Sequence, residues 1–215
     1  NNMSIYEERP EKPIPNKQVM QDDEFEINPY IDLTDVLNSY VDFYDSVIYF
    51  NEDIGDRTIV DLMIRFRSLL KFRESEDYNG DINKPINLVL NSPGGEIHEM
   101  MGLIDYIDSL KQPVNIIVRG KAFSAAAVVL ASTTGQRMAS VNSTIMFHQP
   151  RSMMEGKLTD VVATIDYVHK IEQSVYKILE SRSNKDASWW KDNMRSDLYL
   201  TADEAKEIGV IDIVI

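Results

Sequence analysis

Ser124 is the first residue whose type and position could do chemistry. It stands at the entry of a stretch otherwise made of alanine and valine, where a polar side chain needs a reason. A serine hydroxyl becomes a nucleophile when a neighbouring base takes its proton. The alternative is a serine that hydrogen-bonds its own backbone, as many serines at helix ends do. Ser124 is therefore a candidate nucleophile whose assignment depends on finding a base.

The chain offers three histidines as that base. His148 follows a β-branched run, so we expect its ring at the end of a strand. His98 follows a Gly-Gly pair at the start of a predicted helix and could also approach a site. His169 lies off the apolar stripe of a long predicted helix, which indicates a solvated surface histidine. A carboxylate must also hold the imidazole in the correct tautomer, and spacing alone does not choose it among the 35 acidic residues.

Two turns rich in glycine or alanine could supply a further catalytic group, a pair of backbone amides. Residues 91–95 (NSPGG) follow one predicted strand, and residues 119–127 (RGKAFSAAA) follow the next. Small residues let backbone N–H groups approach a ligand closely at a helix start, where those groups lack partners within the helix. Such N–H groups can stabilise the oxyanion that forms during acyl transfer. Taken alone, either turn is more often an ordinary tight turn.

The elements that must position these groups alternate between strands and helices. Short β-branched runs predict strands at residues 47–50, 86–90, 114–118, 144–147 and 211–215. Apolar residues at three- and four-residue spacing, together with a Thr-x-x-Glu capping box near the end, predict helices at residues 56–72, 97–110, 123–132, 158–180 and 201–209. This alternation predicts an α/β fold, in which functional groups usually sit where strands hand over to helices.

The first 45 residues differ in composition from the rest of the chain. They hold 11 acidic against 3 basic residues, together with four prolines. This composition predicts an extended acidic arm over residues 1–45, containing a short helix at residues 31–44. A single domain is expected to follow at residues 46–215.

The composition of the 215-residue chain narrows the class of function. A net charge of −13 argues against nucleic acid as the main partner, because phosphate binding needs a positive patch. No apolar run reaches the roughly 20 residues that a membrane span needs. The absence of cysteine excludes disulfides, thiolate zinc sites and cysteine nucleophiles. These features fit a soluble cytoplasmic protein.

Four separated motifs indicate which of the candidate residues form one site. The runs INLVLNSPGGEI, GKAFSAAAVVLAS, STIMFHQP and SDLYLTADEAKEIGVID occur in this order. Together they resemble the proteolytic subunit of the Clp protease (the ClpP family) over residues 46–215. The resemblance implies that Ser124 is the nucleophile, His148 the general base and Asp197 the acid that orients the base. It also implies that the amides of Gly95 and Ala125 form the oxyanion hole.

The same resemblance implies a fold and an assembly. The fold would be a ClpP/crotonase-like α/β arrangement of repeated β-β-α units, with a protruding handle helix within residues 151–182. The activity would be that of a serine endopeptidase that cleaves unfolded polypeptides and short peptides. Homo-oligomeric heptameric rings would stack as a tetradecamer and work with an AAA+ Clp ATPase. ATP would be used by that partner, and this chain would bind no cofactor and no metal.

The sequence departs from the family pattern at several positions. Phe123 stands where the family usually has a small residue, Ala125 where methionine is common, and Ser196 where an arginine is usual. The acidic arm also lacks the usual axial-loop pattern. These departures leave open a second function, that of a non-catalytic or regulatory subunit of a ClpP-like ring. A third is an acyl-CoA enzyme of the crotonase type, because those enzymes share a related fold and a paired-amide oxyanion site.

Overall fold

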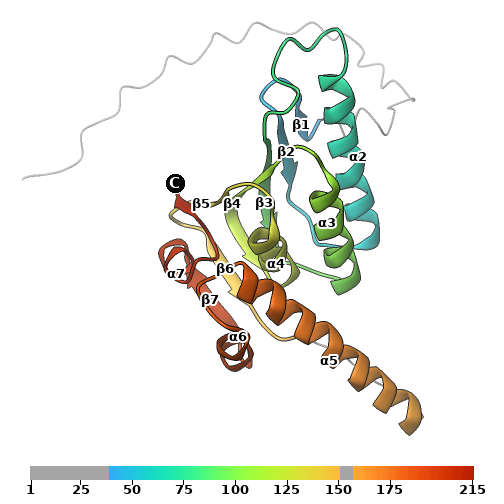
Figure 1. The fold of residues 1–215 in the computed structure, drawn as a ribbon, viewed down its shortest axis with the longest axis vertical. Helices are drawn as coiled ribbons and strands as arrows, with labels where there is room; N and C mark the ends of the chain where they lie inside the picture. Colours follow the sequence, from blue (N-terminus) through green and yellow to red (C-terminus); the bar gives the residue numbers. More distant parts are fainter. Residues whose placement is uncertain (1–38, 151–156) are drawn as a thin grey trace, which may run out of the picture. The chain divides into compact units, whose positions relative to one another are not determined.

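The computed structural model describes residues 39–150 and 157–215. Residues 1–38 of the predicted arm, and residues 151–156 at the start of the predicted handle, lie outside the described residues. Within the described residues the chain forms eight strands and six helices (Figure 1). The predicted α/β class is confirmed.

All eight strands of the described residues belong to one mixed sheet. They are β1 (Val41–Asp42), β2 (Val47–Phe50), β3 (Ile86–Ser92), β4 (Val114–Phe123), β5 (Arg137–Ala139), β6 (Thr144–Phe147), β7 (Leu198–Thr201) and β8 (Ile213–Val214). The main path runs β1-β2-β3-β4-β5-β8, and every neighbouring pair after β1-β2 is parallel. The first part of the long strand β4 pairs with β5, whereas its end pairs with β6. The end of β4 is therefore the point from which the sheet continues to β6 and β7.

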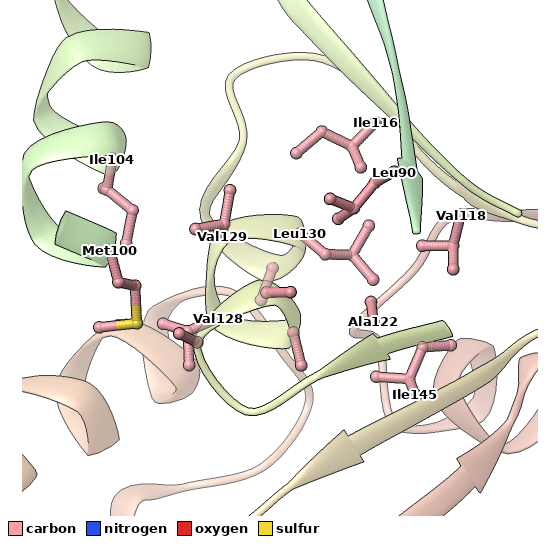
Figure 2. Close-up of a cluster of buried hydrophobic side chains, with 14 of the residues drawn as sticks. Leu90, Met100, Ile104, Ile116, Val118, Ala122, Val128, Val129, Leu130 and Ile145 are labelled. Carbon is pink, nitrogen blue, oxygen red and sulfur yellow. The ribbon is translucent and has the colours of Figure 1, made fainter. Parts of the chain in front are cut away.

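The six helices follow the strands in the order that crossover connections require. They are α2 (Asp56–Arg73), α3 (Ile97–Ser109), α4 (Ala125–Ser132), α5 (Leu158–Ser181), α6 (Ala187–Asn193) and α7 (Ala202–Glu207). All eight residues of α4 are buried, which is the expected fate of a helix that is apolar all round. Figure 2 shows α4 between Ile104 of α3 and the strand residues Leu90 and Ile116. This packing fixes the entry of α4, where Ser124 lies.

The long helix α5 has two halves with different surroundings. In its second half, Val175, Tyr176 and Leu179 are buried. In its first half, Leu158 is 79% exposed and Val162 is 51% exposed. The apolar side chains of the first half are thus open to solvent in the single chain. No helix in the described part of the protein is long and apolar enough to cross a membrane.

The short helix predicted at residues 31–44 is wrong for its described part. Ser39 and Tyr40 form a turn, and Val41–Asp42 pair antiparallel with β2. The backbone N–H of Asp45 donates to the carboxylate of Asp42 at 2.9 Å, which closes a turn instead of continuing a helix. Pairing with β2 decides the conformation here, because the formation of short strands depends strongly on their neighbours.

Arg65 ties α2 to the end of β2. Its side chain is only 2% exposed, and its guanidinium donates to the Tyr49 carbonyl oxygen and to the Glu52 carboxylate, each at 2.8 Å. Replacing Arg65 by alanine is expected to lower the free energy of unfolding by about 3 kcal/mol, because both acceptors lose their partner. Urea denaturation measures this change. Arg67→Ala, on the exposed side of the same helix, is the control. Equal stabilities of the two variants would contradict the role given to Arg65.

Candidate active site

Ser124 lies in a tight turn between β4 and α4. Its backbone has φ +55° and ψ −121°, and Ser46 is the only other non-glycine residue with positive φ in the described part of the chain. Such a conformation costs about 1–3 kcal/mol and persists only where the surroundings impose it. Here the Ser124 N–H donates to the Met146 carbonyl oxygen at 2.7 Å. A strained strand-to-helix turn of this kind presents a serine hydroxyl at the edge of a sheet.

His148 reaches Ser124 because their strands are neighbours. The ends of β4 and β6 pair in parallel, with Phe123 opposite Met146. His148 follows directly after β6, and its Nε2 atom lies 2.7 Å from the Ser124 hydroxyl oxygen. The imidazole is 16% exposed, so it is largely shielded from solvent. The predicted base is thus within hydrogen-bond distance of the predicted nucleophile.

Asp197 is placed by the antiparallel ladder between β6 and β7. The last pair of this ladder is Phe147 with Leu198. Continuing the same register by one residue sets His148 opposite Asp197. The Nδ1 atom of His148 lies 3.5 Å from the Asp197 carboxylate. Resting sites often show such longer separations, which shorten when substrate binds. A carboxylate on Nδ1 favours the tautomer in which Nε2 accepts the serine proton.

The two predicted amide donors, Gly95 and Ala125, line the same cavity as Ser124. Ala125 is the first residue of α4, so its N–H is one of those without a partner inside the helix. Gly94 and Gly95 have positive φ values of +88° and +156°. A side chain on Gly94 would clash with the Phe123 carbonyl oxygen and lie 2.9 Å from the Ser124 Cβ. Glycine is therefore needed for β3 to end this close to the serine turn.

The cavity beside these groups has a volume of about 610 Å³. Apolar side chains from three helices and from β6 form much of its wall: Met100, Val128, Met146, Ile171 and Val175. A backbone carbonyl held near the Ser124 hydroxyl could place its adjacent side chain in this apolar cavity. In the described residues no group of three or more His, Asp and Glu side chains has the geometry of a metal site.

Sequence reasoning missed the residues that hold the base in place. Gln149 follows His148, and its backbone N–H donates to the Met194 carbonyl oxygen at 3.1 Å. Its side-chain amide donates to the hydroxyl of Tyr176 at 3.2 Å, and that hydroxyl donates to Glu172 at 2.7 Å. Burial raises the pKa of Tyr176 to about 12, so it stays neutral at ordinary pH. Tyr176 lies 27 residues from Gln149, and no local pattern connects them.

The other two histidines contact residues of α5. His169 is 68% exposed and pairs with Glu172 at 3.5 Å, which confirms the predicted surface position. His98 is exposed at the rim of the cavity, where its Nε2 atom lies 2.9 Å from the hydroxyl of Tyr167. Its hydrogen bond joins it to α5 and not to Ser124, so His148 is the better candidate base.

The departures from the family pattern also have defined positions. The ring of Phe123 packs edge-on against that of Tyr199, with centroids 5.8 Å apart. Ser196 is exposed, and the guanidinium of its neighbour Arg195 pairs with Asp192 at 2.9 Å. Arg195 is thus adjacent to Ser196 in the sequence, but its guanidinium forms an ion pair at the end of α6.

A comparison with protein-family models agrees with the motifs. The model of the Clp protease family matches residues 42–215, which is well over half of the chain. The match includes all the strands that carry the candidate site. The resemblance inferred from the four motifs is confirmed at this level. The chain belongs to the Clp protease family.

Proposed function

We propose that this protein is a serine endopeptidase that cleaves unfolded polypeptides and short peptides. The observation that carries the proposal is the 2.7 Å separation between His148 Nε2 and the Ser124 hydroxyl oxygen. The Asp197 carboxylate lies on the other ring nitrogen, which supports the role of His148 as a base. Membership in the Clp protease family supports a peptidase over an acyl-CoA enzyme.

The proposed mechanism follows from these positions. His148 takes the Ser124 proton as the serine oxygen attacks a peptide carbonyl carbon. The amides of Gly95 and Ala125 stabilise the resulting oxyanion. His148 then gives its proton to the leaving amine, and an acyl-enzyme forms. Water, deprotonated by His148, attacks the acyl carbon. The bond from that carbon to the Ser124 oxygen then breaks, His148 returns the proton to this oxygen, and the new carboxyl group is released. Every step uses side chains and amides of this chain, with Asp197 stabilising the imidazolium.

The proposal includes an assembly. Family membership and the apolar side chains exposed on the first half of α5 support stacked homo-oligomeric rings, with heptameric rings forming a tetradecamer. The candidate site would then face an internal chamber, and an AAA+ Clp ATPase would deliver unfolded chains to it. Access would restrict the choice of substrate more than sequence does. We place this assembly in the cytoplasm.

Cleavage of short fluorogenic peptides by the purified chain tests the proposed activity. We expect hydrolysis without ATP, and we expect a serine-reactive fluorophosphonate to stop it. A mass near that of a tetradecamer of 24.6 kDa subunits, measured by light scattering, tests the assembly separately. A particle of this mass that cleaves no peptide would instead support a non-catalytic ring subunit.

A further inference from the structure

The contact between His98 and Tyr167 has no part in the proposed mechanism. His98 lies in the first turn of α3, three residues after Gly95, and Tyr167 lies in α5. The Tyr167 hydroxyl and His98 Nε2 are 2.9 Å apart. The two rings are also stacked, with centroids 5.9 Å apart and planes inclined by 21°. Two separate interactions thus join residues that are 69 positions apart in the chain.

This pair forms part of the rim of the cavity beside Ser124. Both side chains line the cavity, and both are exposed, with Tyr167 at 47%. The wall below is buried and apolar, because Met100 is 2% exposed and Val175 is 4% exposed. A substrate side chain that enters from solvent and reaches this wall must pass residues of the rim.

The pair also joins two helices that share a support. Both α3 and α5 pack against α4. The contact between His98 and Tyr167 joins the start of α3 directly to α5. Flat rings that are stacked and hydrogen-bonded resist the separation of the two helices more than two unconnected side chains do. The width of the cavity rim therefore depends on this contact.

We propose that His98 and Tyr167 set the upper size limit of the substrate side chain that enters the cavity next to the scissile bond. This inference rests on the proposed peptidase function and names a specificity determinant of the same site. The side chain concerned is that of the residue whose carbonyl is attacked, called P1. Side chains up to a limiting width pass the rim and reach the apolar wall, whereas a wide bicyclic side chain is obstructed.

Peptides that differ only at P1 test this proposal. We compare kcat/KM for P1 alanine, leucine and tryptophan in the full chain and in the variants Tyr167→Phe, Tyr167→Ala and His98→Ala. We expect Tyr167→Ala and His98→Ala to raise the ratio of tryptophan to alanine by about tenfold, the change typical of a modest alteration in a pocket. Tyr167→Phe loses only the hydrogen bond, so its ratio should rise by less. The double variant should change less than the two single effects combined, because both remove one contact.

His169→Ala is the matched control. It removes a histidine from α5, the helix that carries Tyr167, at a position outside the cavity lining. It should leave all ratios unchanged. The inference is overturned if both alanine variants cleave peptides with the wild-type ratio, or if kcat/KM falls by the same factor for every P1 residue. The second result would indicate that the pair only stabilises the fold. A wild-type chain that cleaves none of the peptides would overturn the proposed function, and this inference with it.

Discussion

Replacing Ser124 by alanine is expected to lower kcat for peptide cleavage by about 10⁶-fold and to abolish labelling by a fluorophosphonate probe. The reason is that the attacking atom itself is removed, while His148 and the amides remain without a nucleophile to serve. Ser124 is half-buried, and alanine keeps its Cβ and adds no atom at this strained turn, so the variant should fold like the wild type. Cleavage of a fluorogenic peptide and gel-based detection of the probe measure the two effects.

Two further variants are compared with Ser124→Ala: a control at another serine and a change of the orienting acid. Ser174→Ala removes an exposed serine from α5 and should leave labelling and cleavage unchanged. Asp197→Asn keeps the shape of the orienting side chain but favours the wrong imidazole tautomer, so kcat should fall by about 10⁴-fold. Labelling that persists in Ser124→Ala at the wild-type rate would remove the basis of the proposed mechanism.

Replacing Gly94 by alanine is expected to lower kcat for peptide cleavage by 10²-fold or more while the chain remains folded. Gly94 has φ +88°, and an added Cβ would lie 3.0 Å from the Ala125 nitrogen and clash with the Phe123 carbonyl oxygen. The turn must therefore move away from Ser124, and the neighbouring Gly95 amide moves with it. Loss of one oxyanion donor typically reduces kcat by about 10²–10³-fold.

Gly102→Ala is the natural control for this experiment. Gly102 lies in the middle of α3, and an added Cβ there would meet no atom within 4 Å. Alanine should raise stability by about 0.5–1 kcal/mol because it favours the helix, and it should leave cleavage unchanged. Circular dichroism shows whether each variant is folded. If Gly94→Ala is folded and cleaves peptides at the wild-type rate, the Gly-Gly turn does not serve the reaction.

The parts of this fold that depend on local pattern could be predicted from the sequence. The β-branched runs at β2, β3, β4 and β6 and the apolar periodicity of α2 give strong signals over short distances. The predicted Thr201–Glu204 capping box is present, with the Glu204 N–H donating to the Thr201 hydroxyl at 3.2 Å. Hydrogen bonds from Thr201 to the carboxylate lower the pKa of Glu204.

The acid of the candidate site could not be chosen in this way. Asp197 approaches His148 only because β6 and β7 pair, and those strands are separated by two helices. Only the resemblance to a family singles out Asp197 from the sequence. The partners Tyr176 of Gln149 and Tyr167 of His98 were missed for the same reason. Each contact depends on where α5 packs, which its own residues do not specify.

The pairing of β6 with β7 determines where the chain can tolerate insertions and deletions. The chain between its strands can gain or lose residues without altering the distance from imidazole to carboxylate, as long as the same residues remain paired. One residue inserted within β7 itself would turn alternate side chains to the other side of the sheet and carry the carboxylate away from its partner. Length variation is therefore tolerated in the connection and excluded from the few residues that it joins.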